Sequence, residues 1–220
     1  VVKWLTLPQQ QRPHLITFYM SDVDHAGHDH GPDAPETGAA VKEVDAAVGK
    51  LAEAVGKLGL PVNFIFLADH GMSLVDTTYR MDLTAEIDTG AFIVKGGGTT
   101  IHLYARDPGA VQSQYARLKK SDAPYDVYLK ANLPGAWHYS TTDDRYGRIG
   151  DIVVVPHYPK VFSTGNRRII PGAHGFDPAL KEMQAVFCAW GPAFRKGIKI
   201  NSFENVHVYP MVCTLLGLTY

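Results

Sequence analysis

Residues 41–71 read VKEVDAAVGKLAEAVGKLGLPVNFIFLADHG, and this segment carries the strongest indication of the fold. In its first half, apolar residues recur at spacings of three and four, which is typical of an amphipathic helix with one apolar face. Gly59 is a natural end for that helix, and residues 61–67 then form a short apolar run of the kind found in buried strands. The apolar positions of the helix are Val41, Val44, Val48, Leu51, Val55 and Leu58.

A second apolar run precedes the helix. Residues 14–20 are rich in β-forming side chains and end at a polar, glycine-containing stretch, which indicates another buried strand. Strand, helix and strand in this order form a βαβ unit, so the sequence predicts an α/β fold with a largely parallel sheet flanked by helices. Because ligands of such sheets bind at the carboxyl ends of the strands, we expect the functional site just after these two strands.

The remaining elements are predicted by shorter signals, and the pattern is less regular between about residues 80 and 145. Glycines 96–98 separate two β-rich runs and predict a hairpin with a glycine turn. The other expected elements are a helix over 111–120, strands over 151–155 and 184–190, a loop over 172–178 and a final helix over 206–216.

The composition excludes several classes of protein. The 220 residues contain 21 Lys and Arg against 22 Asp and Glu, and this net charge of −1 is unlike that of a protein that coats nucleic acid. A hydrophobic content of 45% with 20% charged residues is typical of a globular chain. No run approaches about 18 uncharged apolar residues, so we expect no membrane span. The two cysteines, Cys188 and Cys213, are too few for a disulfide framework or a cysteine-based zinc site, although they could form one disulfide with each other.

Histidine and aspartate gather in three stretches that are far apart in the sequence. The first, residues 22–32, reads DVDHAGHDHGP and is interpreted as a glycine-containing loop. The second, residues 69–71, follows a predicted strand, and the third is His174 in a predicted loop. Taken singly, each has a plain alternative: a solvated polar loop, a capping aspartate beside a half-buried histidine, or an ordinary loop histidine.

Taken together, the three stretches predict a two-metal site. Carboxylate oxygens and imidazole nitrogens suit divalent ions, and each metal needs three or four protein ligands and an open position for a substrate oxygen. The sequence offers five candidate ligands, which are too many for one catalytic zinc ion and too few for two. Two other kinds of site are excluded, because the sequence has neither the P-loop motif of nucleotide-binding proteins nor the Gly-x-Ser-x-Gly elbow of Ser-His-Asp hydrolases. The candidate ligands are Asp24, His28, Asp69, His70 and His174.

The same stretches carry a resemblance to a known family. The motifs are Tyr19-x4-Asp24-x3-His28 continuing to Gly31-Pro32, then Ala68-Asp69-His70-Gly71-Met72, then Gly172-x-His174-Gly175. In these motifs, and in weaker similarities over nearly the whole chain, the sequence resembles the nucleotide pyrophosphatase/phosphodiesterase family of the alkaline phosphatase superfamily. The resemblance implies an alkaline-phosphatase-like fold that is incomplete at the N-terminus. Residues 1–220 would be the C-terminal portion of a single catalytic domain, with about 80–145 as a less regular insertion or sub-region.

The resemblance also implies roles for the matching residues. Two zinc ions are expected, the second in a site that is incomplete in this chain, although manganese or iron would accept the same ligand types. Tyr19 is expected to line the substrate pocket and stack on the nucleotide base. The expected ligands of one ion are Asp24, His28 and His174, and those of the other are Asp69 and His70.

The activity that the resemblance implies is hydrolysis of nucleotide phosphodiester or pyrophosphate bonds, releasing nucleoside monophosphates. The family's nucleophile is a threonine upstream of where this sequence begins, so we nominate no catalytic residue and expect the chain alone to be inactive. Its expected partners are a nucleotide-like diester substrate and the N-terminal segment of the same domain. A periplasmic or secreted location is likewise a family implication, because no targeting signal is visible.

Two alternatives stay open. One is another hydrolase of the same superfamily, acting on phosphomonoesters, phosphonates or lipid phosphodiesters. The other is a non-catalytic fragment that binds metal for structural purposes.

Overall fold

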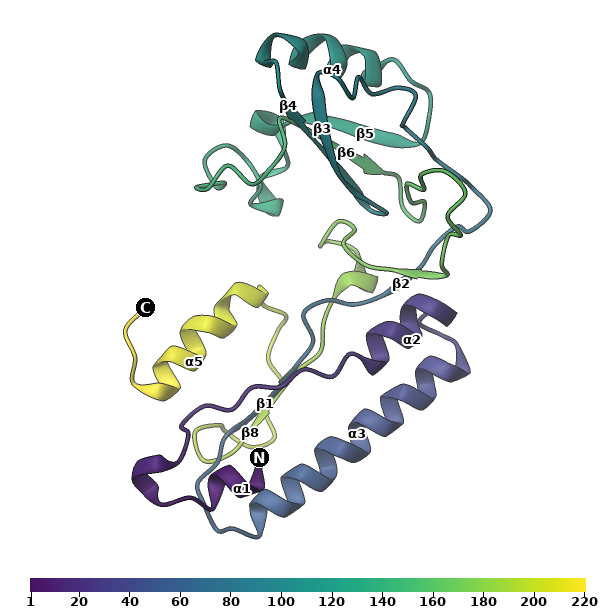
Figure 1. The fold of residues 1–220 in the computed structure, drawn as a ribbon. Coiled ribbons are helices and arrows are strands. Elements are labelled where there is room, and N and C mark those ends of the chain that lie inside the picture. The colour runs from purple at the N-terminus through teal and green to yellow at the C-terminus, as the bar shows by residue number, and fades with distance from the viewer. The chain divides into compact units, whose positions relative to one another are not determined.

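The computed structural model describes all 220 residues, which divide into two units (Figure 1). One unit comprises Val1–Val23, Ala39–Asp69 and Ala185–Tyr220, and the other comprises Asp24–Gly38 and His70–Gln184. We refer to them as unit 1 and unit 2. Each unit is therefore assembled from segments that are remote in the sequence.

The long helix predicted from the apolar periodicity is confirmed as α3, Pro35–Gly56. Most of its length lies in unit 1. Its apolar stripe is covered unevenly, because Val55 is buried, Val41 is exposed and the two valines between them are half-buried. The periodicity located the helix, but the depth of its burial depends on what packs against it.

Unit 1 contains a two-stranded antiparallel sheet. It pairs β1, Phe64–Leu67, with β8, Phe187–Trp190, so that Phe64 lies opposite Trp190. The rings of these two residues stack with their centroids 5.0 Å apart. Two further helices belong to this unit, α1 at Val2–Leu5 and α5 at Val208–Leu216.

The prediction of a largely parallel sheet is wrong for the sheets in this structure. All the ladders are antiparallel, and residues 14–20, where the βαβ interpretation needed a strand, form none. A strand requires backbone N–H and C=O groups to meet a partner in a ladder. The composition of residues 14–20 reflects β propensity, which does not determine whether a partner is present. The chain remains a mixed α/β structure with small sheets.

The prediction of a loop over residues 22–32 is also wrong, because α2 spans Asp22–His30. Gly27 lies inside this helix and is buried, and a Cβ atom there would lie 3.2 Å from the side chain of Met72. A glycine within a helix costs about 0.5–1 kcal/mol relative to alanine. Here the missing side chain allows the helix to lie closely against Met72, so tertiary packing outweighs the local preference.

Unit 2 contains a four-stranded antiparallel sheet with the order β3-β4-β6-β5 (Figure 1). Its core is formed by buried residues that include Phe92, Leu103, Ile152 and Val154, and Leu118 of the adjacent helix joins them. The strands are β3 at Phe92–Gly97, β4 at Thr100–Ala105, β5 at Tyr125–Leu129 and β6 at Ile152–Pro156, and the helix is α4 at Val111–Lys119.

The hairpin predicted around the three glycines is confirmed. Gly96, Gly97 and Gly98 have φ angles of 93°, 146° and 63°, which L-residues with a Cβ atom rarely adopt. Gly97 pairs with Thr100, so the tip of the hairpin consists of Gly98 and Thr99.

Short elements complete the structure. In unit 2, β2 at Ser73–Leu74 pairs antiparallel with β7 at Gly172–Ala173. Cys188 is exposed and Cys213 is buried, and both are free thiols. No helix combines the length and the apolar character that crossing a membrane requires. Single 3₁₀ turns occur at Gln9–Gln11, Pro108–Ala110, Lys130–Asn132, Gly135–Trp137, Lys181–Met183 and Asn205–His207.

Candidate metal centre

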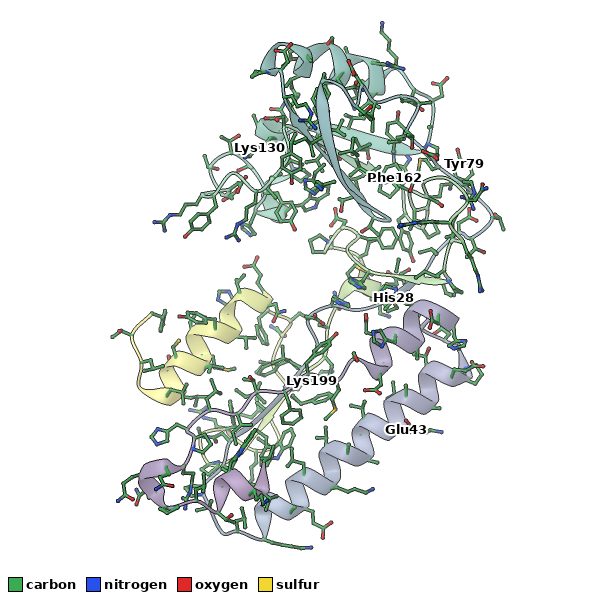
Figure 2. The ribbon with its side chains drawn as sticks, in the orientation of Figure 1. His28, Glu43, Tyr79, Lys130, Phe162 and Lys199 are labelled. Atoms are coloured by element: carbon green, nitrogen blue, oxygen red, sulfur yellow. The ribbon has the colours of Figure 1, made fainter.

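Two of the candidate ligands lie on one face of helix α2. Asp24 and His28 are four residues apart, which is about one helical turn, so their side chains project in the same direction. His28 Nε2 lies 3.6 Å from Asp24 Oδ1. The position of His28 on the helix is labelled in Figure 2. The helix therefore brings one oxygen and one nitrogen donor together without help from a distant segment.

The third candidate ligand is contributed by the chain just after β7. His174 directly follows that strand, and its Nε2 lies 3.7 Å from the same Oδ1 atom of Asp24. The rings of His28 and His174 have their centroids 5.0 Å apart. The donor atoms of the three residues all lie within 4.8 Å of one another. Segments 146 residues apart in the sequence thus converge on one carboxylate oxygen.

The backbones of helix α2 and strand β7 lie very close together. A Cβ atom on Gly172 would lie 1.9 Å from the carbonyl oxygen of Gly27, so only glycine fits there. This approach places the Gly172 carbonyl oxygen 2.9 Å from His28 Nδ1. A carbonyl only accepts hydrogen bonds, so Nδ1 carries the proton and Nε2 presents a lone pair toward Asp24. That is the tautomer in which histidine binds a metal through Nε2.

The carboxylate of Asp24 indicates what the three residues can bind. Its Oδ1 atom is shielded from solvent and has no hydrogen-bond partner. A buried carboxylate oxygen without a partner is costly unless a cation compensates it. Donors bound tetrahedrally at about 2.1 Å from zinc lie about 3.4 Å apart, close to the two separations from Asp24. The residues therefore fit a divalent metal ion of the zinc type.

The three side chains leave the metal position accessible. Those of Asp24, His28 and His174 are 24%, 26% and 32% exposed. A metal held by three protein ligands on one side keeps a coordination position open toward solvent. Such a position can accept an oxygen atom of a phosphate group, and the charge of the ion can replace the basic patch that this chain lacks.

The structure gives the other predicted site residues different surroundings. The ring of His70 stacks on that of His174, with centroids 3.5 Å apart and an angle of 11° between the planes. Asp69 is the last residue of its segment of unit 1, and its backbone carbonyl accepts a hydrogen bond from Asn205 Nδ2 at 3.4 Å. Tyr19, also in unit 1, is 70% exposed.

Two groups that shape the centre were missed in the sequence. One is the carbonyl oxygen of Gly172, which selects the tautomer of His28. The other is Thr99, whose hydroxyl donates a hydrogen bond to the carbonyl oxygen of His174 at 3.1 Å. The glycines before Thr99 predicted a turn, but no local signal connects that turn with a residue 75 positions later.

Comparisons with known proteins agree with the motifs. A model of the type I phosphodiesterase/nucleotide pyrophosphatase family matches residues 1–177. The chain is 33% identical over 234 residues to ectonucleotide pyrophosphatase/phosphodiesterase family member 1 of Mus musculus. It is 33% identical over 230 residues to venom phosphodiesterase 2 of Crotalus adamanteus. Each match covers 99% of this chain but only 25% and 28%, respectively, of the relative, so the chain spans about a quarter of their length.

Solved structures with a similar fold belong to the same family. Human ectonucleotide pyrophosphatase/phosphodiesterase 5 matches with a TM-score of 0.87 at 28% identity, over 99% of this chain and 57% of that one. The murine protein, in an inactive threonine-to-alanine form in complex with AMP, matches with the same TM-score at 29% identity and the same coverage. The match is to an alkaline-phosphatase-like fold. From the family model and the motifs together, the chain belongs to the type I phosphodiesterase/nucleotide pyrophosphatase family.

Proposed function

We propose that this chain carries metal-binding residues of a hydrolase that cleaves nucleotide phosphodiester or pyrophosphate bonds and releases nucleoside monophosphates. The observation that supports it best is the shielded Oδ1 atom of Asp24, which has no hydrogen-bond partner and faces the Nε2 atoms of His28 and His174. The murine relative in complex with AMP supports the substrate class, because AMP is a nucleoside monophosphate.

Each residue has a defined part in the proposal. Asp24, His28 and His174 would hold one zinc ion, and Asp69 and His70 would contribute to a second. The ions would supply charge that neutralises phosphate oxygens and favours ionisation of a hydroxyl nucleophile. His28, fixed by the Gly172 carbonyl, would keep its Nε2 lone pair directed at the ion throughout the reaction.

We propose a threonine as the nucleophile, supplied from outside residues 1–220. The inactive threonine-to-alanine form of the murine relative supports a threonine in this role. Within the chain, the hydroxyl of Thr99 donates a hydrogen bond to the His174 carbonyl oxygen. We therefore expect hydrolysis only when residues 1–220 are joined to the segment that carries the nucleophile.

Tyr19 is our candidate for contact with the nucleotide base. Tyr19 is 70% exposed, and aromatic rings bind planar bases by stacking. Replacement of Tyr19 by alanine should raise KM for a nucleotide diester more than it lowers kcat, because stacking on the base is a contact that the substrate makes before the reaction begins.

We also propose that residues 1–220 form the C-terminal portion of a single catalytic domain, with about 80–145 as a less regular insertion or sub-region. The proposal that the chain is part of a larger domain is supported by its coverage of 57% of the matched human structure. A periplasmic or secreted location is proposed on the same family basis. Fractionation of cells that express the complete gene would test the location, and recovery in the cytoplasm would contradict it.

The metal-binding part of the proposal is tested with His28→Ala. We expect the wild-type chain to bind at least one zinc equivalent after dialysis, and the variant to bind zinc at least about 100-fold more weakly, because one of three ligands is lost. The matched control is His157→Ala, which removes an exposed histidine that also faces an aspartate, Asp126, at 3.3 Å. Equal zinc binding by wild type and His28→Ala would contradict the proposal.

The reaction is tested with the polypeptide that includes the nucleophile-bearing segment. We expect hydrolysis of the p-nitrophenyl ester of thymidine 5′-monophosphate to exceed that of p-nitrophenyl phosphate, and to be lost in His28→Ala. A preference for the monoester would favour a phosphomonoesterase of the same superfamily. Zinc binding without any turnover would favour a non-catalytic metal-binding protein. Equal activity of residues 1–220 alone would contradict the external nucleophile.

A further inference from the structure

We propose that Thr99, at the tip of the β3–β4 hairpin, is a positioning residue that holds the candidate metal ligand His174 in place. The antiparallel sheet of unit 2 contributes no candidate ligand, yet its hairpin tip would then control the affinity of the centre for metal. The inference rests on the proposed metal centre, and its experiment separates failure of the two.

The hairpin tip is itself firmly held. The N–H of Gly98 donates to the carbonyl oxygen of Phe162 at 3.2 Å, and the N–H of Phe162 donates to that of Gly98 at 2.7 Å. Phe162, labelled in Figure 2, is buried in the core of the sheet. A residue at this tip therefore has a fixed position relative to the core, which is a requirement for any residue that positions another.

Thr99 presents its hydroxyl to the backbone at His174. The residue is 9% exposed, and its Oγ1 atom donates to the His174 carbonyl oxygen at 3.1 Å. The next residue, Gly175, has a φ angle of 85°, and a Cβ atom there would lie 2.9 Å from Thr99 Oγ1. The hairpin tip and the 174–175 backbone are thus in close contact, made possible by a glycine.

His174 is therefore held from two sides. On its N-terminal side, Ala173 pairs with Ser73 in the β2–β7 ladder. On its C-terminal side, the hairpin tip with Thr99 contacts the 174–175 backbone. A metal site tolerates little displacement of its donors, so loss of the second support should weaken binding while leaving all three ligands present.

The test is a cobalt titration of the 220-residue chain, in which Co²⁺ absorption reports both affinity and coordination geometry. Thr99→Val keeps the shape of the side chain but removes the hydroxyl, and leaves the His174 carbonyl without that donor. We expect the Kd for Co²⁺ to rise roughly 3- to 10-fold, with a changed visible spectrum. Thr99→Ser restores the hydroxyl and should bind within about twofold of wild type.

Two further variants complete the design. Thr214→Val removes a threonine hydroxyl that donates to a carbonyl within helix α5, and it should leave Co²⁺ binding unchanged. Gly175→Ala places a methyl group against Thr99 Oγ1 and also strains the backbone at a φ angle of 85°, so it should weaken binding as well. If Thr99→Val fails to fold, as judged by circular dichroism, unchanged binding by folded Gly175→Ala would still contradict the proposal.

The outcomes separate failure of the positioning role of Thr99 from failure of the metal centre itself. Wild-type affinity and spectrum in folded Thr99→Val, or in folded Gly175→Ala, would overturn the positioning role while leaving the metal centre intact. Wild-type binding by His174→Ala would overturn the metal centre itself. A lower Tm of the metal-free Thr99→Val chain with unchanged Kd would show a purely structural hydroxyl, which also contradicts the proposal.

Discussion

The four-stranded sheet of unit 2 and the strand pair of unit 1 are built from similarly apolar sequence but bury it very differently. Val153 and Val154 in β6 are completely buried, as is Leu103 in β4. In the strand pair, Leu67 remains 39% exposed and Trp190 38% exposed. An apolar run becomes core only when strands on both sides and a helix on one face cover it, and an isolated pair of strands lacks that cover.

The comparison also shows where the stability of the chain should lie. The core cluster that contains Leu118 of α4 is continuous through all four strands of the β3-β4-β6-β5 sheet in unit 2. The buried apolar residues of unit 1, by contrast, are isolated positions such as Leu5, Val55 and Cys213. Since hydrophobic stabilisation scales with the apolar area removed from water, unit 2 should unfold last.

The largest expected effect would come from a cavity in the sheet of unit 2. Leu103→Ala should lower the free energy of unfolding by about 2–5 kcal/mol, because the site is fully buried and cannot collapse easily. Leu67→Ala, the matched change in β1, should cost only about 1 kcal/mol. Urea denaturation measures the first change by Trp137 fluorescence in a Trp4→Phe/Trp190→Phe background, and the second by Trp190 fluorescence in a Trp4→Phe/Trp137→Phe background. Equal costs at the two positions would remove the contrast between the units.

A smaller pair of effects with opposite signs comes from two glycines. Gly172→Ala forces a methyl group into the carbonyl oxygen of Gly27 and should cost about 1–3 kcal/mol, with weaker metal binding as His28 loses its fixed acceptor. Gly49→Ala in α3 meets open space and should stabilise the chain by about 0.5–1 kcal/mol. Thermal unfolding gives both signs, and stabilisation by Gly172→Ala would contradict the close approach.

The smallest effect is a pH dependence of the unit 2 sheet. Burial lowers the pKa of His102 in β4 below its ordinary value of 6.5, and its Nδ1 atom accepts a hydrogen bond from the Gly150 N–H at 3.3 Å. The unfolded chain therefore binds a proton more readily than the folded one, and stability should fall as the pH drops below about 6.5. His102→Gln should show a shallower fall between pH 7.5 and 5 than the control His14→Gln. Parallel stability curves for the two variants would refute this.

Features set by local pattern could be predicted from the sequence. The spacing of valines and leucines located α3, and three consecutive glycines located the β3–β4 turn, because both depend on residues close together in the chain. The direction and partners of the strands were not predictable in the same way. The sequence of residues 61–67 does not indicate that β1 pairs with β8, more than 100 residues later, or that the pairing is antiparallel.

In the candidate site, too, the local features could be predicted from the sequence, whereas the supporting contact from a distant hairpin could not. The spacing of Asp24 and His28 was visible in the sequence, although the helix that uses it was mistaken for a loop because of Gly27. The convergence of the three stretches was predicted from their ligand types and the expected sheet, and the family motifs assigned both residues to one ion with His174. The structure places the donor atoms of these three residues within 4.8 Å of one another. The support from Thr99 had no sequence signal, because it depends on how a hairpin tip packs against a distant strand end.

The placement of Asp24 and His28 one turn apart on α2 has a consequence for how the centre assembles. Two of its three candidate donors lie within a nine-residue helix, so they would present a chelating pair to an ion as soon as that helix forms. His174, which follows β7, would supply the third donor. A bound ion would then link helix α2 to strand β7 and stabilise their packing.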